Sequence, residues 1–478
     1  MSRVERDSLG EKEIDNDRYY GIQTLRAKEN FPISGQRVHP LLIKNLGYIK
    51  KAAALMNYEV GLLEKSIAEV IVKAANEIIE GKFQDDFIVD AIQGGAGTSI
   101  NMNVNEVIAN RAIELLGGKK GDYTIVHPNN HVNMSQSTND VVPTAIKMTT
   151  INLLAELIEE LNELRDSLKE KSLEFDDVVK VGRTQLQDAV PIRLGQEFKA
   201  YALVIDRDIG RIQSSIDSVR VVNMGGTAIG TCLNADELYT KGIVNKINEI
   251  SGFKLLQAKD LIDATQNNDS LLEVSSHLKT CAVNLSKIAN DLRLLSSGPR
   301  AGIGEINLPA VQPGSSIMPG KINPVIPEVV NQVSFQIIGN DLTITMAIEA
   351  GQLELNAMLP IVAYNLFESI KILKNAVNTF TNNAIKGITA NELRCKNLVE
   401  NSLSLITVLT PHLGYEVCSI IAQKALKSGK NIREIILEEG YLLKDELDKI
   451  LNPYEMTKGG IVAKELLINK RKNQSISD

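Results

Sequence analysis

Residues 314–324 read Gly-Ser-Ser-Ile-Met-Pro-Gly-Lys-Ile-Asn-Pro and place hydroxyl groups, a lysine and an asparagine among glycines and prolines. This composition predicts a loop, because proline lacks a backbone donor and glycine adopts backbone angles that other residues avoid. Hydroxyl, ammonium and amide groups at such close spacing indicate a loop that holds an anion and removes a proton from it. A mobile polar surface loop is the alternative that this stretch alone leaves open.

The spacing within this loop excludes a nucleotide phosphate loop. Such a loop has four residues between its glycines and a Ser or Thr directly after its lysine. Here five residues separate Gly314 from Gly320, and Ile322 follows Lys321. The anion that this loop holds is therefore not expected to be a nucleotide.

Two other glycine- or hydroxyl-rich stretches precede predicted helices. Residues 94–99 lead into an apolar periodic segment, and the free N–H groups of a helix start can take a carboxylate. Residues 135–140 are followed by Pro143, so we expect a helix from about residue 144. The alternative for this second stretch is a simple helix cap by Asp140.

A third stretch, residues 182–188, is predicted to be a loop before Pro191 and a helix that ends near Val219. Each loop taken alone is weak support for a site. Four loops rich in Ser, Thr, Asn and Gly, each next to a helix, together predict a nest of neutral donors with one lysine, suited to a small dicarboxylate.

The chain is predicted to be mostly helical. In residues 146–168 apolar side chains recur at three- and four-residue steps, while glutamates fill the opposite face. Residues 329–350 are apolar on nearly all sides, which predicts a helix in the middle of a bundle or between subunits. From about residue 387 the helical patterns become shorter, which indicates a small separate C-terminal domain.

Composition restricts the partners of this 478-residue chain. Its formal net charge of −7 argues against nucleic acid, which favours a basic face. Continuous apolar runs stay below the roughly 18 residues of a membrane span, and the first residues lack the apolar core of a signal peptide. The widely separated cysteines are expected to be free thiols of a cytoplasmic protein. Without paired CxxC spacing, a dedicated transition-metal site is not expected.

The four loops are similar to the substrate-binding segments of the aspartase/fumarase superfamily. Residues 314–324 resemble its signature loop, GSSxMPxKxNP, and Thr98, residues 137–140 and residues 182–184 match its other segments. The similarity extends from residues 19–24 to the segment Gly-Ile-Thr-Ala-Asn that begins at Gly387. Several motifs in the right order are far more specific than any one alone.

This resemblance implies an all-α fold of three domains around a central long-helix bundle. The expected domains are an N-terminal helical domain at 1–140, the central long-helix bundle at 141–386 and a small C-terminal helical domain at 387–478. The resemblance further implies a small dicarboxylate substrate and a homotetramer whose active sites are shared between subunits. It implies no organic cofactor.

Roles for individual residues also follow from the resemblance. Ser315 is expected to be the catalytic base. The expected substrate-binding residues are Thr98, Ser137, Thr138 and Ser316 for the β-carboxylate, Lys321 and Asn323 for the α-carboxylate, and Asn139, Thr184 and Gln185 for the amino group.

Three positions favour an ammonia-lyase within the superfamily, acting on L-aspartate to give fumarate. Gln185 stands where fumarate hydratases usually have His, and Thr138 and Tyr20 stand where they usually have Ser and Trp. An amide only hydrogen-bonds and cannot relay protons at neutral pH, so the charge-paired dyad of the hydratases is missing. The alternatives are a fumarate hydratase and, from a different class, a catalytically silent structural protein of the lens-crystallin kind.

Overall fold

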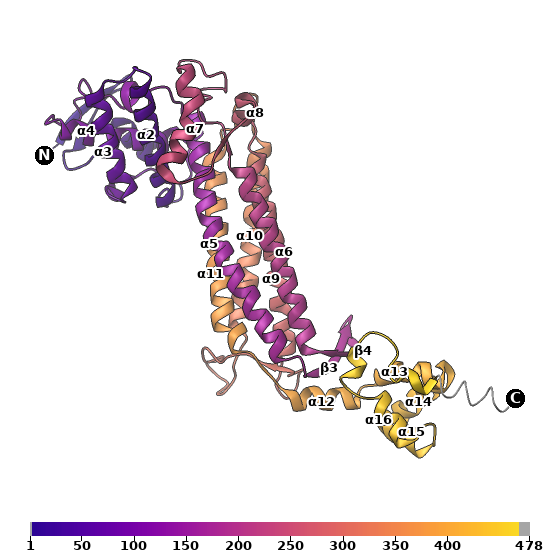
Figure 1. The fold of residues 1–478 in the computed structure, drawn as a ribbon. Coiled ribbons are helices and arrows are strands. Elements are labelled where there is room, and N and C mark those ends of the chain that lie inside the picture. Colours follow the sequence, from indigo (N-terminus) through magenta and orange to yellow (C-terminus); the bar gives the residue numbers. More distant parts are fainter. Residues whose placement is uncertain (1, 468–478) are drawn as a thin grey trace. The chain divides into compact units, whose positions relative to one another are not determined.

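The computed structural model describes residues 2–467, and helices dominate it (Figure 1). The chain forms two compact units, each made of separate stretches of sequence. Unit 1 comprises residues 1–159, 208–283 and 333–375, and unit 2 comprises residues 160–207, 284–332 and 376–478. The predicted three-domain division at residues 140 and 386 stays a prediction.

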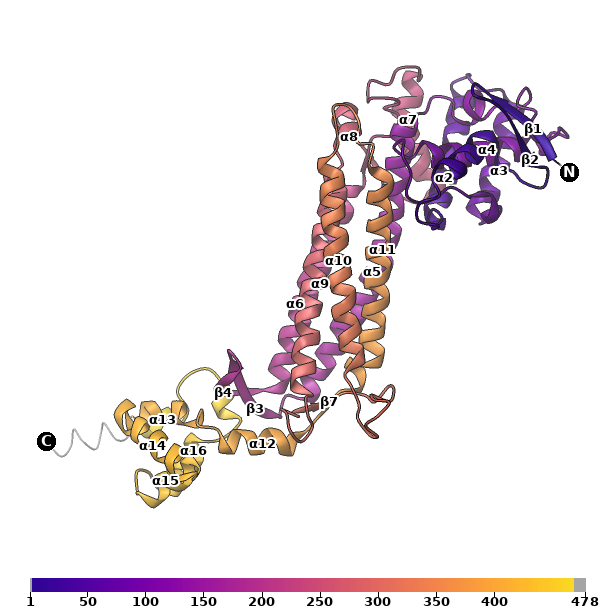
Figure 2. The ribbon, with the colours of Figure 1, turned by 180° about the vertical axis from the view of Figure 1, so that it is seen from behind.

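Five long helices contribute segments to the units. They are α5 (Thr138–Glu174), α6 (Leu194–Val219), α9 (Asp269–Leu295), α10 (Val325–Glu349) and α11 (Leu359–Asn383). Within each unit their segments lie side by side in both views (Figures 1 and 2). In unit 1 this packing includes buried polar pairs, with Ser275 of α9 donating to Asp341 of α10 at 2.7 Å and Asn340 of α10 donating to Ser369 of α11 at 3.0 Å.

The helix predicted from residues 146–168 is confirmed as part of α5. Its predicted start near residue 144 is wrong, because α5 begins at Thr138 and contains Pro143. Among residues 2–467, α5 alone is long and apolar enough to cross a membrane by length and composition. Since 72% of its most apolar window is buried inside the protein, α5 has the burial expected of a core helix.

The apolar helix predicted at residues 329–350 is confirmed as α10, but it is not buried on every side. Ile337 and Ile344 are almost fully buried within the chain. Phe335, Leu342 and Met346 are 63%, 62% and 64% exposed. One face of α10 therefore packs within this chain, and another apolar face is left uncovered by it.

The N-terminal part of unit 1 packs short elements together. These are β1 (Ser2–Asp7), β2 (Gly10–Asp15), α1 (Ile22–Asn30), α2 (Pro40–Glu59), α3 (Lys65–Ile79) and α4 (Thr98–Leu115), with a π-helix at Pro128–Val132. Strands β1 and β2 form an antiparallel hairpin in which Ser2 pairs with Asp15. Helices α7 (Glu237–Ser251) and α8 (Leu261–Gln266) and the parallel pair β5 (Val221–Val222) and β6 (Leu256–Gln257) complete this unit.

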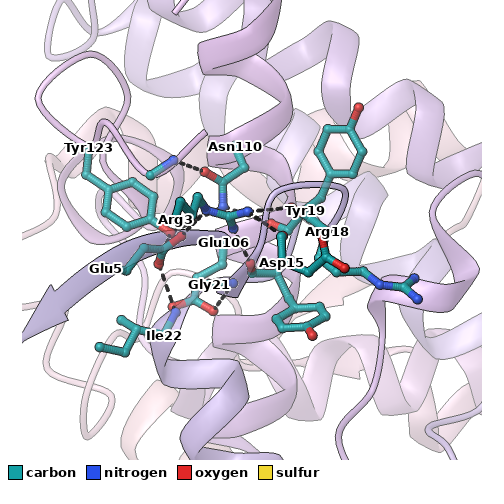
Figure 3. Close-up of polar contacts among 12 residues, drawn as sticks. Arg3, Glu5, Asp15, Arg18, Tyr19, Gly21, Ile22, Glu106, Asn110 and Tyr123 are labelled. Atoms are coloured by element: carbon teal, nitrogen blue, oxygen red, sulfur yellow. Dashed lines mark hydrogen bonds and ion pairs between the residues drawn. The ribbon is translucent and has the colours of Figure 1, made fainter. Parts of the chain in front are cut away.

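Two buried carboxylates hold the start of α1 (Figure 3). Glu106 of α4 accepts the backbone N–H groups of Gly21, Gln23 and Thr24, and Glu5 of β1 accepts that of Ile22. Together they satisfy donors that a helix start leaves without partners. Burial raises the pKa of Glu106 to about 7. The same helix, α4, begins at Thr98, so this cap ties α1 to the helix that carries an expected site residue.

Unit 2 contains the antiparallel hairpin of β3 (Val179–Thr184) and β4 (Gln187–Arg193) and the short pair β7 (Ile306–Asn307) and β8 (Thr389–Ala390). Its C-terminal helices are α12 (Glu392–Asn401), α13 (Leu405–Leu413), α14 (Tyr415–Ser428), α15 (Ile432–Glu438) and α16 (Lys444–Ile450). Helices α13 to α16 bury a common apolar core that includes Leu409, Ile421, Ile436 and Leu447. The shorter helices predicted after residue 387 are thus confirmed.

Candidate active site

The loop at residues 314–324 is closed by contacts within itself. The N–H of Gly314 donates to the carbonyl of Lys321 at 2.8 Å, and the Asn323 side chain donates to the carbonyl of Gly314 at 2.7 Å. A side chain at position 314 would place its Cβ only 2.3 Å from the Lys321 carbonyl oxygen. Glycine is therefore required at position 314 for the loop to close.

Ser315 lies in this loop with its hydroxyl oxygen facing backbone donors. The N–H groups of Ile317 and Met318 donate to Ser315 Oγ at 3.2 and 3.0 Å. Donors aimed at an oxygen favour its negatively charged form. Such donors are one of the features that a serine acting as a base requires. Ser316 and Lys321 beside it are exposed.

In unit 1, Thr98 stands at the first position of α4, so the expected helix start is confirmed. The Thr98 hydroxyl donates to the carbonyl of Gly95 at 2.7 Å, and its side chain is exposed. One turn along α4, the Asn101 side chain donates to the hydroxyl of Thr138 at 3.3 Å. The structure thereby brings the Thr98 and Thr138 segments together through α4.

A reciprocal cap shapes the segment at residues 137–140. The N–H of Asn139 donates to the Ser137 hydroxyl at 3.2 Å, and Asp140 accepts the N–H of Ser137 at 2.9 Å. The simple cap by Asp140 is therefore corrected, because Asp140 folds back from inside the first turn. Its second oxygen accepts the N–H groups of Gly225 and Thr227, each at 3.1 Å.

Pro143 explains how this segment is tied to a distant loop. Because proline has no N–H, the carbonyl of Asn139 loses the donor that an α-helix would give it. The Asn223 side chain donates to this carbonyl at 2.9 Å instead. The Asn139 side chain in turn donates to the carbonyl of Ala228 at 2.7 Å. The loop after β5 therefore completes the first turn of α5.

A buried lysine, Lys50 of α2, contacts the residues directly before this segment. The sequence patterns did not single it out. Its ammonium donates to the side-chain oxygens of Asn133 and Gln136 at 2.8 and 3.0 Å. Burial lowers the pKa of Lys50 to about 7 and raises that of Asp140 to about 6. The available signal was a lysine at a position of α2 where the helical periodicity calls for an apolar residue.

The stretch at residues 182–188 is not the predicted loop before a helix. It is the turn of the β3–β4 hairpin, in which Thr184 pairs with Gln187. Gln185 and Leu186 form the turn with φ of +53° and +62°, and both are exposed. At Gly182 a Cβ would lie 2.6 Å from the Val190 carbonyl, which explains the glycine before the expected site residues.

The expected site residues divide between the two units. Thr98, Ser137, Thr138 and Asn139 belong to unit 1, and Thr184, Gln185, Ser315, Ser316, Lys321 and Asn323 belong to unit 2. Within unit 1, Asn101 of α4 contacts Thr138, while the Thr98 hydroxyl bonds to Gly95 and the Ser137 hydroxyl to the N–H of Asn139. In unit 2 the hairpin turn and the Ser315 loop each present exposed polar side chains.

His127 and His131 stand four residues apart, a metal-ligand spacing that the sequence analysis overlooked. The Nδ1 atom of His131 accepts the N–H of His127 at 3.0 Å, and that of His127 accepts the N–H of Asn129 at 3.0 Å. Burial lowers the pKa of both rings. Within residues 2–467, no group of three or more His, Cys, Asp or Glu side chains is placed to hold a metal ion.

Comparison with protein families agrees with this arrangement of segments. A family model described as Lyase matches residues 10–339, and one described as Fumarase C C-terminus matches residues 405–458. The chain belongs to the aspartase/fumarase superfamily. The first match covers all four loops, including Ser315, and ends within α10.

Individual superfamily members are similar over nearly their whole length. An aspartate ammonia-lyase of Bacillus subtilis (strain 168) is 58% identical over 97% of this chain and 98% of its own. The structure of fumarate lyase:delta crystallin from Brucella melitensis bound to cobalt is 49% identical, with a TM-score of 0.94 over 96% of this chain and 100% of its own. A class II fumarase from Schistosoma mansoni is 36% identical, with a TM-score of 0.91 over 96% of this chain and 99% of its own. These superfamily structures confirm the predicted all-α fold.

Proposed function

We propose that this chain is an ammonia-lyase that converts L-aspartate reversibly to fumarate and ammonia. The observation that carries the proposal is Ser315, whose hydroxyl oxygen accepts two backbone N–H groups in a self-closed loop. Gln185, in place of a protonatable His, favours ammonia over water as the leaving group. The 58% identity to an aspartate ammonia-lyase, against 36% to a class II fumarase, favours the same choice.

In the proposed reaction, the deprotonated Ser315 oxygen takes a proton from the carbon next to the β-carboxylate. The electron pair left behind spreads onto that carboxylate as an aci-carboxylate dianion. As the pair returns to form the carbon–carbon double bond, the carbon–nitrogen bond breaks and the amino group leaves as ammonia. Donors fixed where the charge develops lower the barrier most.

The contact between Asn101 of α4 and Thr138 supports the placement of the β-carboxylate on Thr98, Ser137 and Thr138, with Ser316 added from the loop. Asn101 already holds the Thr138 hydroxyl, so this donor needs little reorganisation. Lys321 and Asn323 are proposed to hold the α-carboxylate, and Asn139, Thr184 and Gln185 the amino group. One amide hydrogen of Asn323 bonds to the carbonyl of Gly314, and the second is proposed to bond to the substrate.

We further propose a homotetramer in which each active site takes its segments from three subunits. The uncovered face of α10 supports this assembly, because Phe335, Ile338, Leu342 and Met346 recur along one stripe and are exposed in the single chain. Leu342→Asp is expected to lower both the sedimentation coefficient and the activity. The control is Leu173→Asp, which alters an exposed leucine of α5 outside this stripe. An active Leu342→Asp monomer would contradict the shared site.

A cytoplasmic location is part of the proposal. It is supported by four free cysteines, three of them buried, in the part of the chain that the structure describes. The proposed reaction needs no organic cofactor.

The experiment that tests the function follows fumarate by its ultraviolet absorbance with L-aspartate and with L-malate. We expect rapid fumarate release from L-aspartate and a rate with L-malate lower by about 10⁴ or more, as for sites built to hydrogen-bond one polar group. Faster dehydration of malate would make the protein a fumarate hydratase. Inactivity with both substrates would leave the structural-protein alternative.

A further inference from the structure

The turn that presents Thr184 and Gln185 is held in an unfavourable backbone conformation. Gln185 and Leu186 both have positive φ, +53° and +62°. Residues other than glycine rarely adopt this region, and a bulky side chain such as that of Leu186 makes it more costly. Leu186 is 70% exposed, so its own packing does not compensate. Other contacts must therefore hold the turn.

A buried charge cluster lies at the residue directly before this turn. Arg183 donates through one nitrogen to both carboxylate oxygens of Glu305, at 2.9 and 3.1 Å. Glu305 is fully buried, and its Oε2 atom also lies 3.1 Å from the ammonium of Lys180, which is 1% exposed. Lys180 donates to Glu197 of α6 at 2.8 Å. Two cations of β3 thus meet two carboxylates from other segments of unit 2.

The position of Glu305 is itself fixed by backbone contacts. Its N–H donates to the carbonyl of Leu295, and its carbonyl accepts the N–H of Asn391 at 2.8 Å. The Cys395 thiol donates to the same carbonyl. A carboxylate held this firmly can define where the Arg183 guanidinium lies, and with it the strand end that precedes Thr184.

We propose that Glu305 is a positioning residue for recognition of the amino group. Through Arg183 it holds the strained turn so that Thr184 and Gln185 face the ammonium group of the substrate. This inference rests on the proposed function and names a residue that acts on one substrate group only. The proposal predicts that Glu305 affects the binding of ammonia but not of fumarate, because the carboxylate-binding candidates lie on other segments.

The reverse reaction tests this separation, because its two substrates have separate KM values. In initial-rate measurements with fumarate and ammonium chloride, Glu305→Gln is expected to raise KM for ammonium at least tenfold. KM for fumarate is expected to change less than threefold. Arg183→Lys keeps the charge but not the two contacts from one guanidinium nitrogen, so the same pattern with a smaller rise is expected.

The matched control is Asp176→Asn. It removes a carboxylate partner of Arg193, which lies at the opposite end of the same hairpin from the turn. Both KM values are expected to stay within twofold of the wild type. A rise in the ammonium KM equal to that of Glu305→Gln would mean that any loosening of the hairpin has this effect, which would overturn the specific role of Glu305.

Glycine at position 186 provides a rescue. Because glycine adopts positive φ at little cost, Leu186→Gly relieves the strain that the cluster opposes. In the Glu305→Gln background, Leu186→Gly is expected to lower the KM for ammonium at least threefold. If Glu305→Gln fails to fold, the same test compares the ammonium KM of Arg183→Lys with that of the double variant Arg183→Lys/Leu186→Gly.

An unchanged ammonium KM in Glu305→Gln and Arg183→Lys, or an equal rise in both KM values, overturns the proposal. Failure of the proposed function is a different result, because the wild-type protein would then form no aspartate from fumarate and ammonium. The two failures are therefore distinguished by the wild-type reaction alone.

Discussion

The segment at residues 137–140 and the loop at residues 314–324 carry similar polar side chains but are supported in different ways. Residues 137–140 are held by groups far away in the sequence, including the side chains of Asn101 and Asn223. The 314–324 loop is closed by its own backbone and by Asn323, and most of its side chains are exposed. Donors that stabilise a developing charge are more effective when they are held rigidly. A loop that carries a catalytic base can instead close over the substrate and exclude water if it is free to move.

Ser315→Ala is expected to give the largest change in activity and almost none in stability. Removing the base should lower kcat by about 10²–10⁴-fold, the usual contribution of a positioned general base. The free energy of unfolding should stay within about 0.5 kcal/mol of the wild type, as for surface changes without buried contacts. Turnover assays and urea unfolding of the purified variant check both. Near-normal turnover would remove Ser315 from the role of base.

Thr138→Val is expected to have the next largest effect. It removes one proposed donor to the β-carboxylate and the acceptor of Asn101 at 3.3 Å. The rate should fall by about 10²–10³, as for loss of one oxyanion-hole donor. Unlike Ser315→Ala, it should also lower the free energy of unfolding measurably. A stability equal to that of the wild type would weaken the distinction between the rigid segment and the loop.

Asn223→Ala tests the support of residues 137–140 through the free energy of unfolding. It leaves the carbonyl of Asn139 without the donor that replaces the missing N–H of Pro143. This acceptor is partly buried, and Asn223 also donates to the buried Thr265 hydroxyl at 3.0 Å. Leaving such acceptors without a partner costs about 1–3 kcal/mol, so the free energy of unfolding should fall by that amount. Urea unfolding measures it. A matched control is Asn307→Ala, which removes an exposed side-chain hydrogen bond to Thr389 and should cost less.

The pH dependence of stability gives the most specific effect. Burial lowers the pKa of Lys50 from 10.5 to about 7, so between these values the unfolded chain binds more protons than the folded one. The contribution of Lys50 to stability therefore rises with pH above about 7, by at most about 1.4 kcal/mol per pH unit. Urea unfolding at pH 7, 8 and 9 should show a steeper rise for the wild type than for Lys50→Met. Equal slopes would place Lys50 in a more polar setting.

Sequence patterns predicted helices well where periodicity was strong and failed where a local rule was overridden by distant contacts. The apolar segment at residues 329–350 was identified as a helix, yet only coordinates reveal which face is left uncovered. Pro143 suggested a helix that starts later than α5 does, because no local rule shows that Asn223 supplies the missing donor. The turn at Gln185 and Leu186 contains no glycine, so nothing in its composition predicted a tight hairpin.

The candidate site was predicted through its motifs rather than through its supporting groups. The polar loop at residues 314–324 follows from residue types and spacing, as does the helix start near Thr98. The role of Ser315 within that loop follows from the resemblance to the superfamily. Lys50 and Glu305 lie outside these motifs, and their importance comes from burial. A charged residue within an apolar periodicity is the one signal that could have found Lys50.

The hydrogen bond from Asn223 to the carbonyl of Asn139 also limits when the first turn of α5 can be completed during translation. Its partners are 84 residues apart in the sequence. A ribosome adding about 5–20 residues per second needs roughly 4–17 seconds to pass from one to the other. During that interval the first turn of α5 has its proline but not the amide that completes it. The segment proposed to hold the β-carboxylate is therefore finished only after residue 223 has left the ribosome, so a nascent chain that stops earlier has α5 residues without a formed binding segment.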